Sequence, residues 1–152
     1  MFYSNTIVYN LFMKIDESLK RPLIGLLFFI AFCDFLAQVF YLYWIVWWLD
    51  VPMHILGGMF AGLFFLAVFR SLTASHPFKE SFIITLAVAI LGALIIGLLW
   101  EVYESIAGVT YSAFGGRRFD TMKDVMMDLT GGSLTALLFS RSSGGGRKFL
   151  PR

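Results

Sequence analysis

The sequence predicts an all-α polytopic membrane protein: a bundle of four transmembrane helices, preceded by a short amphipathic helix at the membrane interface. Composition is the first reason, because 59% of the 152 residues are hydrophobic and the mean hydropathy is +0.78. Only 14% of the residues are charged, whereas soluble domains carry about 25%. The second reason is that apolar segments close to the ~20 residues needed to cross a bilayer recur along the chain. The length suits one compact bundle, and we expect no separate soluble domain.

Residues 1–21 predict the amphipathic helix. Apolar side chains recur there at helical spacing and share one face: Ile7, Val8, Leu11, Phe12, Ile15 and Leu19. Since most of the charged residues lie off that face, the helix is expected to lie on the membrane surface. We expect no cleavable signal peptide, because the first apolar run is too long and no small-residue cleavage site follows it. Pro22 is predicted to begin the first span, where its missing N–H costs little.

The transmembrane domain is predicted over residues 22–140, and residues 141–152 are expected to form a flexible cytoplasmic tail. The four spans are expected at about 23–46, 51–69, 82–104 and 120–139. Within the second span, Gly58 and Gly62 form a small-residue pair that lets a neighbouring helix approach closely.

The distribution of basic residues predicts the orientation. Four spans return the chain to the side on which it began, and that side holds most of the lysines and arginines. The opposite side holds only Arg117, Arg118 and Lys123. The positive-inside rule therefore places both termini in the cytoplasm, with the protein in the cytoplasmic (inner or plasma) membrane.

Acidic residues gather at the outer ends of three spans. The second span begins with Asp50 and His54, the third ends with Glu101 and Glu104, and the fourth begins with Asp120, Asp124 and Asp128. Four-residue spacing puts the members of each series on one helix face. A carboxylate inside a membrane-length helix costs roughly 2.5–3.5 kcal/mol on insertion scales, so the cluster calls for a function or a compensating partner. Asp50 and Asp120 are also plausible helix N-caps.

One compensation is a divalent cation. The candidate ligands are Asp50, His54, Glu101, Glu104, Asp124 and Asp128. One histidine with many carboxylates suits a hard or borderline ion such as Mg²⁺, Mn²⁺ or Fe²⁺. Shared protons, which would make the cluster a proton relay, are a second possibility. Pairing with Arg117, Arg118 and Lys123 is a third, although Lys123 lies about 100° around the helix from Asp124.

Roles follow from these residue types. The candidates for acid–base chemistry are His54, Glu101, Asp124 and Asp128. Arg117 and Arg118 are candidates for holding an anion or a lipid headgroup. Three further polar residues are expected to support this site without binding the ligand themselves: Asp34 and Gln38 of the first span, and Asp120.

The ordered motifs carry a family resemblance. They are Asp50-x3-His54, Glu101, Gly116-Arg117-x-Phe119-Asp120, Asp124 and Asp128-x2-Gly131-Gly132. In order and spacing they resemble the VanZ-like group of small membrane proteins, including the YjdF-like inner-membrane proteins. The chain departs from the usual VanZ-like pattern at Val51, Glu104 and Asp128, where lysine, glutamine and asparagine are common, and so is closer to the YjdF-like type. The resemblance implies a multi-pass cell-envelope protein with a polar site on its outer face.

Three functions are left open by the residues. The first is a membrane enzyme acting on a lipid or lipid-linked headgroup, although no nucleophile motif is present. The second is a proton- or cation-coupled transporter or a binding protein for a headgroup or small molecule. The third is a structural or accessory membrane protein whose polar network fixes helix packing. Membrane lipids are expected partners, and nucleic acid is not, because there is no basic stripe and no zinc-finger spacing.

Overall fold

The computed structural model describes residues 15, 17–74, 79–108 and 116–140. Its helices are α2 (Glu17–Val39), α3 (Leu42–Ile45), α4 (Asp50–Thr73), α5 (Phe82–Ala107) and α6 (Arg117–Phe139). The described residues contain no strand, so the all-α prediction is confirmed for them. Most of the predicted amphipathic helix (1–21) and all of the tail (141–152) lie outside the described residues.

Among the described residues, three helices are long and apolar enough to cross a membrane: Ser18–Val39, Asp50–Thr73 and Phe82–Ala107. These segments agree with the prediction of a membrane protein. The fourth long helix, α6, has 23 residues but carries several charged side chains in its first half. Its crossing of the membrane, and with it the four-span bundle, therefore stays a prediction.

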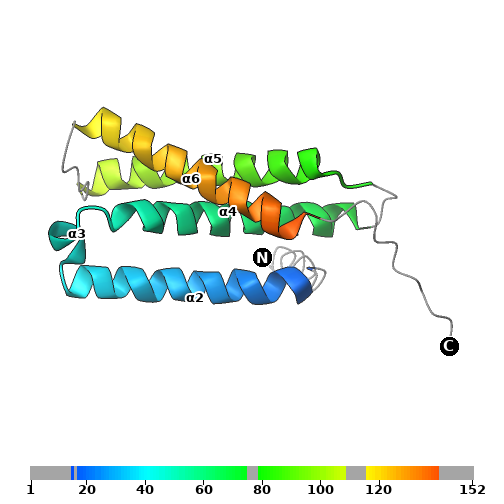
Figure 1. The fold of residues 1–152 in the computed structure, drawn as a ribbon, viewed down its shortest axis with the longest axis horizontal. Coiled ribbons are helices and arrows are strands. Elements are labelled where there is room, and N and C mark those ends of the chain that lie inside the picture. Colours follow the sequence, from blue (N-terminus) through cyan, green and yellow to red (C-terminus); the bar gives the residue numbers. More distant parts are fainter. Residues whose placement is uncertain (1–14, 16, 75–78, 109–115, 141–152) are drawn as a thin grey trace, which may run out of the picture.

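Helix α4 is the centre of the fold. It contacts α2, α5 and α6, and α5 and α6 also contact each other. In Figure 1, α6 crosses over α4 and α5, while α2 runs along the other side of α4. The beginnings of α4 and α6 and the end of α5 consequently lie at the same end of the bundle, near α3. This arrangement brings the acidic ends of three helices together.

Small residues bring α4 and α6 close together. A Cβ atom on Gly58 would lie 2.7 Å from Cα of Asp128, and one on Gly131 would overlap the carbonyl oxygen of Ile55. Further along, a Cβ on Gly62 would lie 3.2 Å from Cα of Gly132. The backbones are therefore in direct contact, as the Gly58–Gly62 spacing predicts.

The first long helix begins earlier than Pro22, which corrects the prediction that the proline starts it. Helix α2 begins at Glu17, so Pro22 lies inside it. The buried side chains of Leu19 and Leu23 flank the proline and pack with Leu63 and Ala67 of α4. Burial of this continuous apolar face favours the helix on both sides of the proline, although Pro cannot donate a backbone hydrogen bond.

The same helix also ends earlier than the span expected over 23–46. It stops at Val39, and Tyr41 adopts a left-handed backbone conformation with φ of 54° before the short helix α3. The hydroxyl of Tyr43 donates a hydrogen bond to Oδ1 of Asp34 at 2.9 Å, which ties the turn back to α2. A left-handed residue breaks a right-handed helix, so the aromatic segment turns toward α4 instead of extending α2.

An ion pair joins the helices at the opposite end of the bundle. Arg70 donates from Nη2 to Oε1 of Glu80 at 2.6 Å and to the carbonyl oxygen of Phe139 at 2.7 Å. The hydroxyl of Thr85 donates to the same glutamate oxygen at 2.6 Å. The network links the end of α4, the beginning of α5 and the end of α6, so both ends of the three-helix core are held by polar contacts.

Candidate functional site

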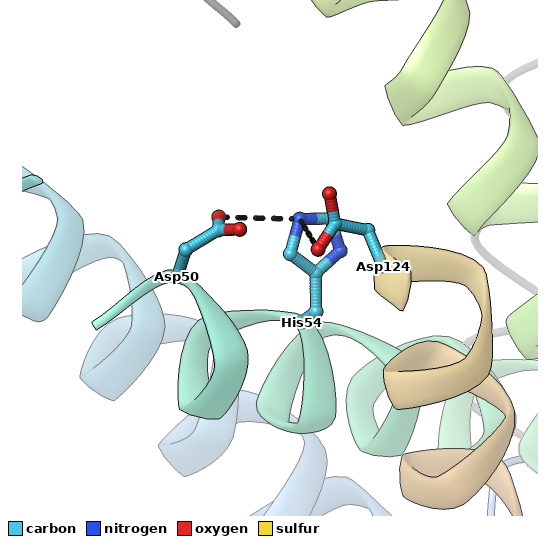
Figure 2. Close-up of side chains that lie close together, drawn as sticks. All are labelled: Asp50, His54 and Asp124. Atoms are coloured by element: carbon cyan, nitrogen blue, oxygen red, sulfur yellow. Dashed lines mark ion pairs between the residues drawn. The ribbon is translucent and has the colours of Figure 1, made fainter. Parts of the chain in front are cut away.

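His54 occupies the centre of the candidate site. It lies on the second turn of α4 and is only 6% exposed. Its Nε2 atom lies 3.4 Å from Oδ1 of Asp50 and 3.9 Å from Oδ1 of Asp124. Figure 2 shows these two carboxylates approaching the same ring nitrogen. The other nitrogen, Nδ1, lies 3.4 Å from Oδ2 of Asp128. One imidazole thus joins three carboxylates from two helices.

The helix register explains this convergence. Asp50 precedes His54 by four residues, so both share one face of α4. Asp124 and Asp128 have the same relationship on α6, whose backbone touches α4 at Gly58. On the α5 side, a Cβ atom at Gly97 would overlap Oδ2 of Asp128. The side chain of Asp128 is therefore enclosed between α4 and α5.

Lys123 forms a second centre beside His54. Its Nζ atom lies 2.9 Å from Oδ2 of Asp50, 3.0 Å from Oδ1 of Asp120 and 3.0 Å from Oδ1 of Asp124. From the sequence, this lysine was predicted only as a possible counter-ion and not as a site residue, because its side chain leaves the helix about 100° away from that of Asp124. The four-carbon stem spans that rotation. The three-residue spacing between Asp120 and Lys123, which places them on one helix face, was the signal that could have identified the lysine.

Neither Asp50 nor Asp120 is an N-cap. The cap positions are Leu49 for α4 and Gly116 for α6, and neither provides a side-chain cap. Both aspartates lie in the first turns of their helices, and both carboxylates accept hydrogen bonds from Lys123. The capping alternative is therefore wrong for these two residues.

The cluster around His54 and Lys123 contains more acidic than basic side chains. Four aspartates surround the basic side chains of Lys123 and His54. Among the described residues, Oε1 of Glu101 is buried without a hydrogen-bond partner. Oδ1 of Asp124 is also buried, but Nζ of Lys123 lies 3.0 Å from it. Leaving a buried polar atom without such a partner costs about 1–3 kcal/mol, so a hydrogen-bond donor or a cation would stabilise Oε1 of Glu101.

Three residues of the cluster form a possible metal-binding group. The group consists of Asp50, His54 and Asp124. Each offers one ligand atom, and these three atoms lie within 4.8 Å of one another. Two ligands bound to one ion at about 2.1 Å lie no more than about 4.2 Å apart. The distances of 3.4 Å and 3.9 Å from His54 Nε2 to the two aspartates are within this limit, and an ion would require the two aspartate oxygens to lie within it as well. Oxygen and imidazole donors of this kind suit Mg²⁺, Mn²⁺ or Fe²⁺.

The other candidate residues occupy different positions. Glu104 is buried and accepts a hydrogen bond from Nε1 of Trp100 at 2.8 Å. In the described part of the chain, no ion pair joins Glu104 or Glu101 to His54 or Lys123. The carboxylate of Asp34 accepts from Tyr43 instead. None of these three acids therefore forms an ion pair with His54 or Lys123 in the described part of the chain, although Glu104 lies close enough to interact electrostatically with His54 and Asp50.

In the described part of the chain, Gln38 and Arg118 form no hydrogen bond or ion pair with the cluster. Gln38 is exposed on α2, and Arg118 is exposed in the first turn of α6. The side chain of Arg117 is outside the described part of the structure. Arg118 precedes Asp120 by two residues, and its exposed guanidinium is accessible to an anion.

Comparison with protein families places the chain among membrane proteins. The family model described as "Predicted membrane protein (DUF2238)" matches residues 6–144. The matched region includes every residue of the clusters around His54 and Lys123. No curated protein and no solved structure matches the chain.

Proposed function

The chain belongs to the DUF2238 family of predicted membrane proteins, and from that premise we propose that it binds a divalent cation at Asp50, His54 and Asp124. The bound cation holds a lipid or lipid-linked headgroup on the extracytoplasmic side of the cell-envelope membrane. The resemblance of the motifs to VanZ-like and YjdF-like proteins supports an envelope role and is part of this proposal.

The observation that carries the proposal is the group of three donor atoms within 4.8 Å. The donors come from two helices in backbone contact, so the group is positioned by rigid elements rather than by a loop. Four aspartates lie around one ammonium and one imidazole, so the cluster holds more acidic than basic groups. A divalent ion would balance the excess of carboxylates and, when bound, would polarise a phosphoryl or carbonyl oxygen.

Asp128 positions the imidazole in this proposal. It faces Nδ1 of His54, whereas Asp50 and Asp124 face Nε2. A proton on Nδ1, donated to Asp128, leaves the lone pair of Nε2 directed toward the cation. Carboxylates in this position orient metal-binding histidines and raise their basicity. The role of Asp128 is then to hold the ring rather than to bind the ion.

The headgroup is expected to meet the site from the membrane interface. The cluster lies at the beginning of α4 and α6, at one end of the apolar helices. Arg118 is exposed at the same end of α6 and offers a guanidinium to a phosphate. A phosphate held by both a cation and an arginine would be fixed in position, which is what acid–base chemistry at the headgroup requires.

Metal binding by the purified full-length protein tests this function. We expect stoichiometric Mn²⁺ in the wild-type protein after dialysis, measured by elemental analysis, and its loss in His54→Gln. The matched control is His76→Gln, which changes the only other histidine of the chain. Wild-type protein that retains no Mn²⁺, Mg²⁺ or Fe²⁺ would overturn the proposal. Lipid retention with and without chelator, followed by native mass spectrometry, tests the headgroup separately.

A structural role is the second candidate, and Lys123 is the observation that favours it. Its ammonium joins Asp50 of α4 to Asp120 and Asp124 of α6, so it links two helices without any ligand. In this case the polar cluster only fixes the packing of the bundle. Neutralising Asp128 would then change stability while leaving every binding property intact.

A further inference from the structure

The ammonium group of Lys123 is fully coordinated by the cluster. A lysine has three N–H donors, and three carboxylate oxygens lie at 2.9–3.0 Å from Nζ. These oxygens belong to Asp50, Asp120 and Asp124. Their arrangement is that of ligands around a cation, with the cation supplied by the chain itself.

The lysine shares its partners with the metal-binding group. Asp50 uses Oδ2 for Lys123 and Oδ1 for His54, whereas Asp124 presents the same Oδ1 atom to both. An ion bound by Asp50, His54 and Asp124 would therefore take over an oxygen that already faces the ammonium. Two cations on one carboxylate oxygen repel each other strongly in a partly buried site.

Lys123 also lies on the accessible side of the cluster. Its side chain is 29% exposed and that of Asp50 is 17% exposed, compared with 6% for His54 and 2% for Asp124. An ion that approaches from the aqueous phase thus meets the lysine and Asp50 before it meets the imidazole. The flexible stem of lysine lets the ammonium swing outward without any movement of the helix.

We propose that Lys123 is a tethered cation that occupies the site at rest, so that a divalent ion binds Asp50, His54 and Asp124 only by displacing it. This inference rests on the proposed metal-binding function and adds a specificity-determining residue to it. A tethered group competes at a high effective concentration, which a weakly attracted monovalent ion does not overcome. A divalent ion is attracted twice as strongly by the same carboxylates. The lysine therefore selects for divalent ions.

The test is a Mn²⁺ titration of the full-length protein, with free Mn²⁺ followed by electron paramagnetic resonance. The variants are Lys123→Met, Lys123→Arg and the control Lys79→Met, which changes an exposed lysine far from the cluster. If the ammonium occupies the oxygens nine-tenths of the time, its removal tightens Mn²⁺ binding about ten-fold. Lys79→Met should bind as the wild type does, and Na⁺ should compete with Mn²⁺ only in Lys123→Met.

A second measurement uses the wild-type protein, so it does not depend on the folding of a variant. Displacement frees the Lys123 amine, and its acylation by a water-soluble amine reagent should accelerate when Mn²⁺ is added. The label on Lys79, measured in the same mass spectrum, is the internal control. Acylation of Lys123 that is unchanged at saturating Mn²⁺ overturns the inference.

The outcomes separate this inference from the proposed function. Equal Mn²⁺ affinity of wild type and Lys123→Met, or weaker binding by that variant, overturns the role of Lys123 and leaves the metal site standing. Binding by Lys123→Met alone supports the tethered cation and overturns metal binding by the natural protein. Absence of binding in all variants overturns both.

Discussion

Gly58 of α4 and Asp128 of α6 are in backbone contact, because a Cβ atom on the glycine would lie 2.7 Å from the aspartate Cα. This contact brings the carboxylate of Asp128 to Nδ1 of His54, one turn before Gly58 on the same helix. Helix packing and the candidate site therefore both depend on Asp128, the first through its backbone and the second through its carboxylate. A change that separates the helices is expected to affect both.

Gly58→Ala is expected to destabilise the bundle by about 1–3 kcal/mol, the usual cost of overpacking. The neighbouring Gly57→Ala is the matched control, since its Cβ would meet only Oδ1 of Asp128 at 3.8 Å, an ordinary contact. Unfolding in detergent, followed by circular dichroism, measures the difference. Equal stability of the two variants would contradict the close approach of α4 and α6.

Asp128→Asn is expected to weaken Mn²⁺ binding about 10–100-fold, because the carboxylate that orients His54 is lost. Asp34→Asn is the control, since Asp34 lies on α2 and accepts from Tyr43. Isothermal titration of both variants provides the measurement. An Asp128→Asn protein with wild-type affinity and altered stability would instead favour the structural role of the cluster.

Glu80→Gln and Arg70→Met are each expected to destabilise the protein by about 3–5 kcal/mol, since each leaves one member of a buried ion pair without its partner. The double variant should lose less than the sum of the two single changes. Thermal unfolding of the four proteins forms a double-mutant cycle. Strictly additive losses would show that the two side chains do not stabilise each other.

The four-span topology predicts that residues 112 and 143 lie on opposite sides of the membrane. Cys33 is the only native cysteine, so Ser112→Cys and Ser143→Cys are made in a Cys33→Ser background. A membrane-impermeant thiol reagent should label position 112 in intact cells and position 143 only after permeabilisation. Labelling of both positions from outside would contradict the crossing of α6 and the cytoplasmic location of the C-terminus.

Much of the fold could be predicted from local features. The beginnings of α4 and α5 lie within a residue of the expected span limits, since Asp50 and Phe82 stand where apolar segments begin. The limits of α2 could not be predicted as well. Burial of Leu19 and Leu23 against α4 favours helix before Pro22, and the left-handed turn at Tyr41 ends the helix. Each of these two limits depends on contacts with other parts of the chain, which the local sequence does not reveal.

The sequence by itself determined that the chain is helical and apolar, and that Asp50 and His54, like Asp124 and Asp128, share helix faces. These properties depend on composition and on the period of one helix, which are local. Only the tertiary structure decided which carboxylates meet. Glu101 and Asp124 were both candidates, yet of these two only Asp124 has a carboxylate oxygen near the His54 ring among the ion pairs of the described residues, and Lys123 supplies a positive charge within the cluster. The axial rotation of each helix and the backbone contact at Gly58 select these partners, and neither is contained in the periodicity of a single segment.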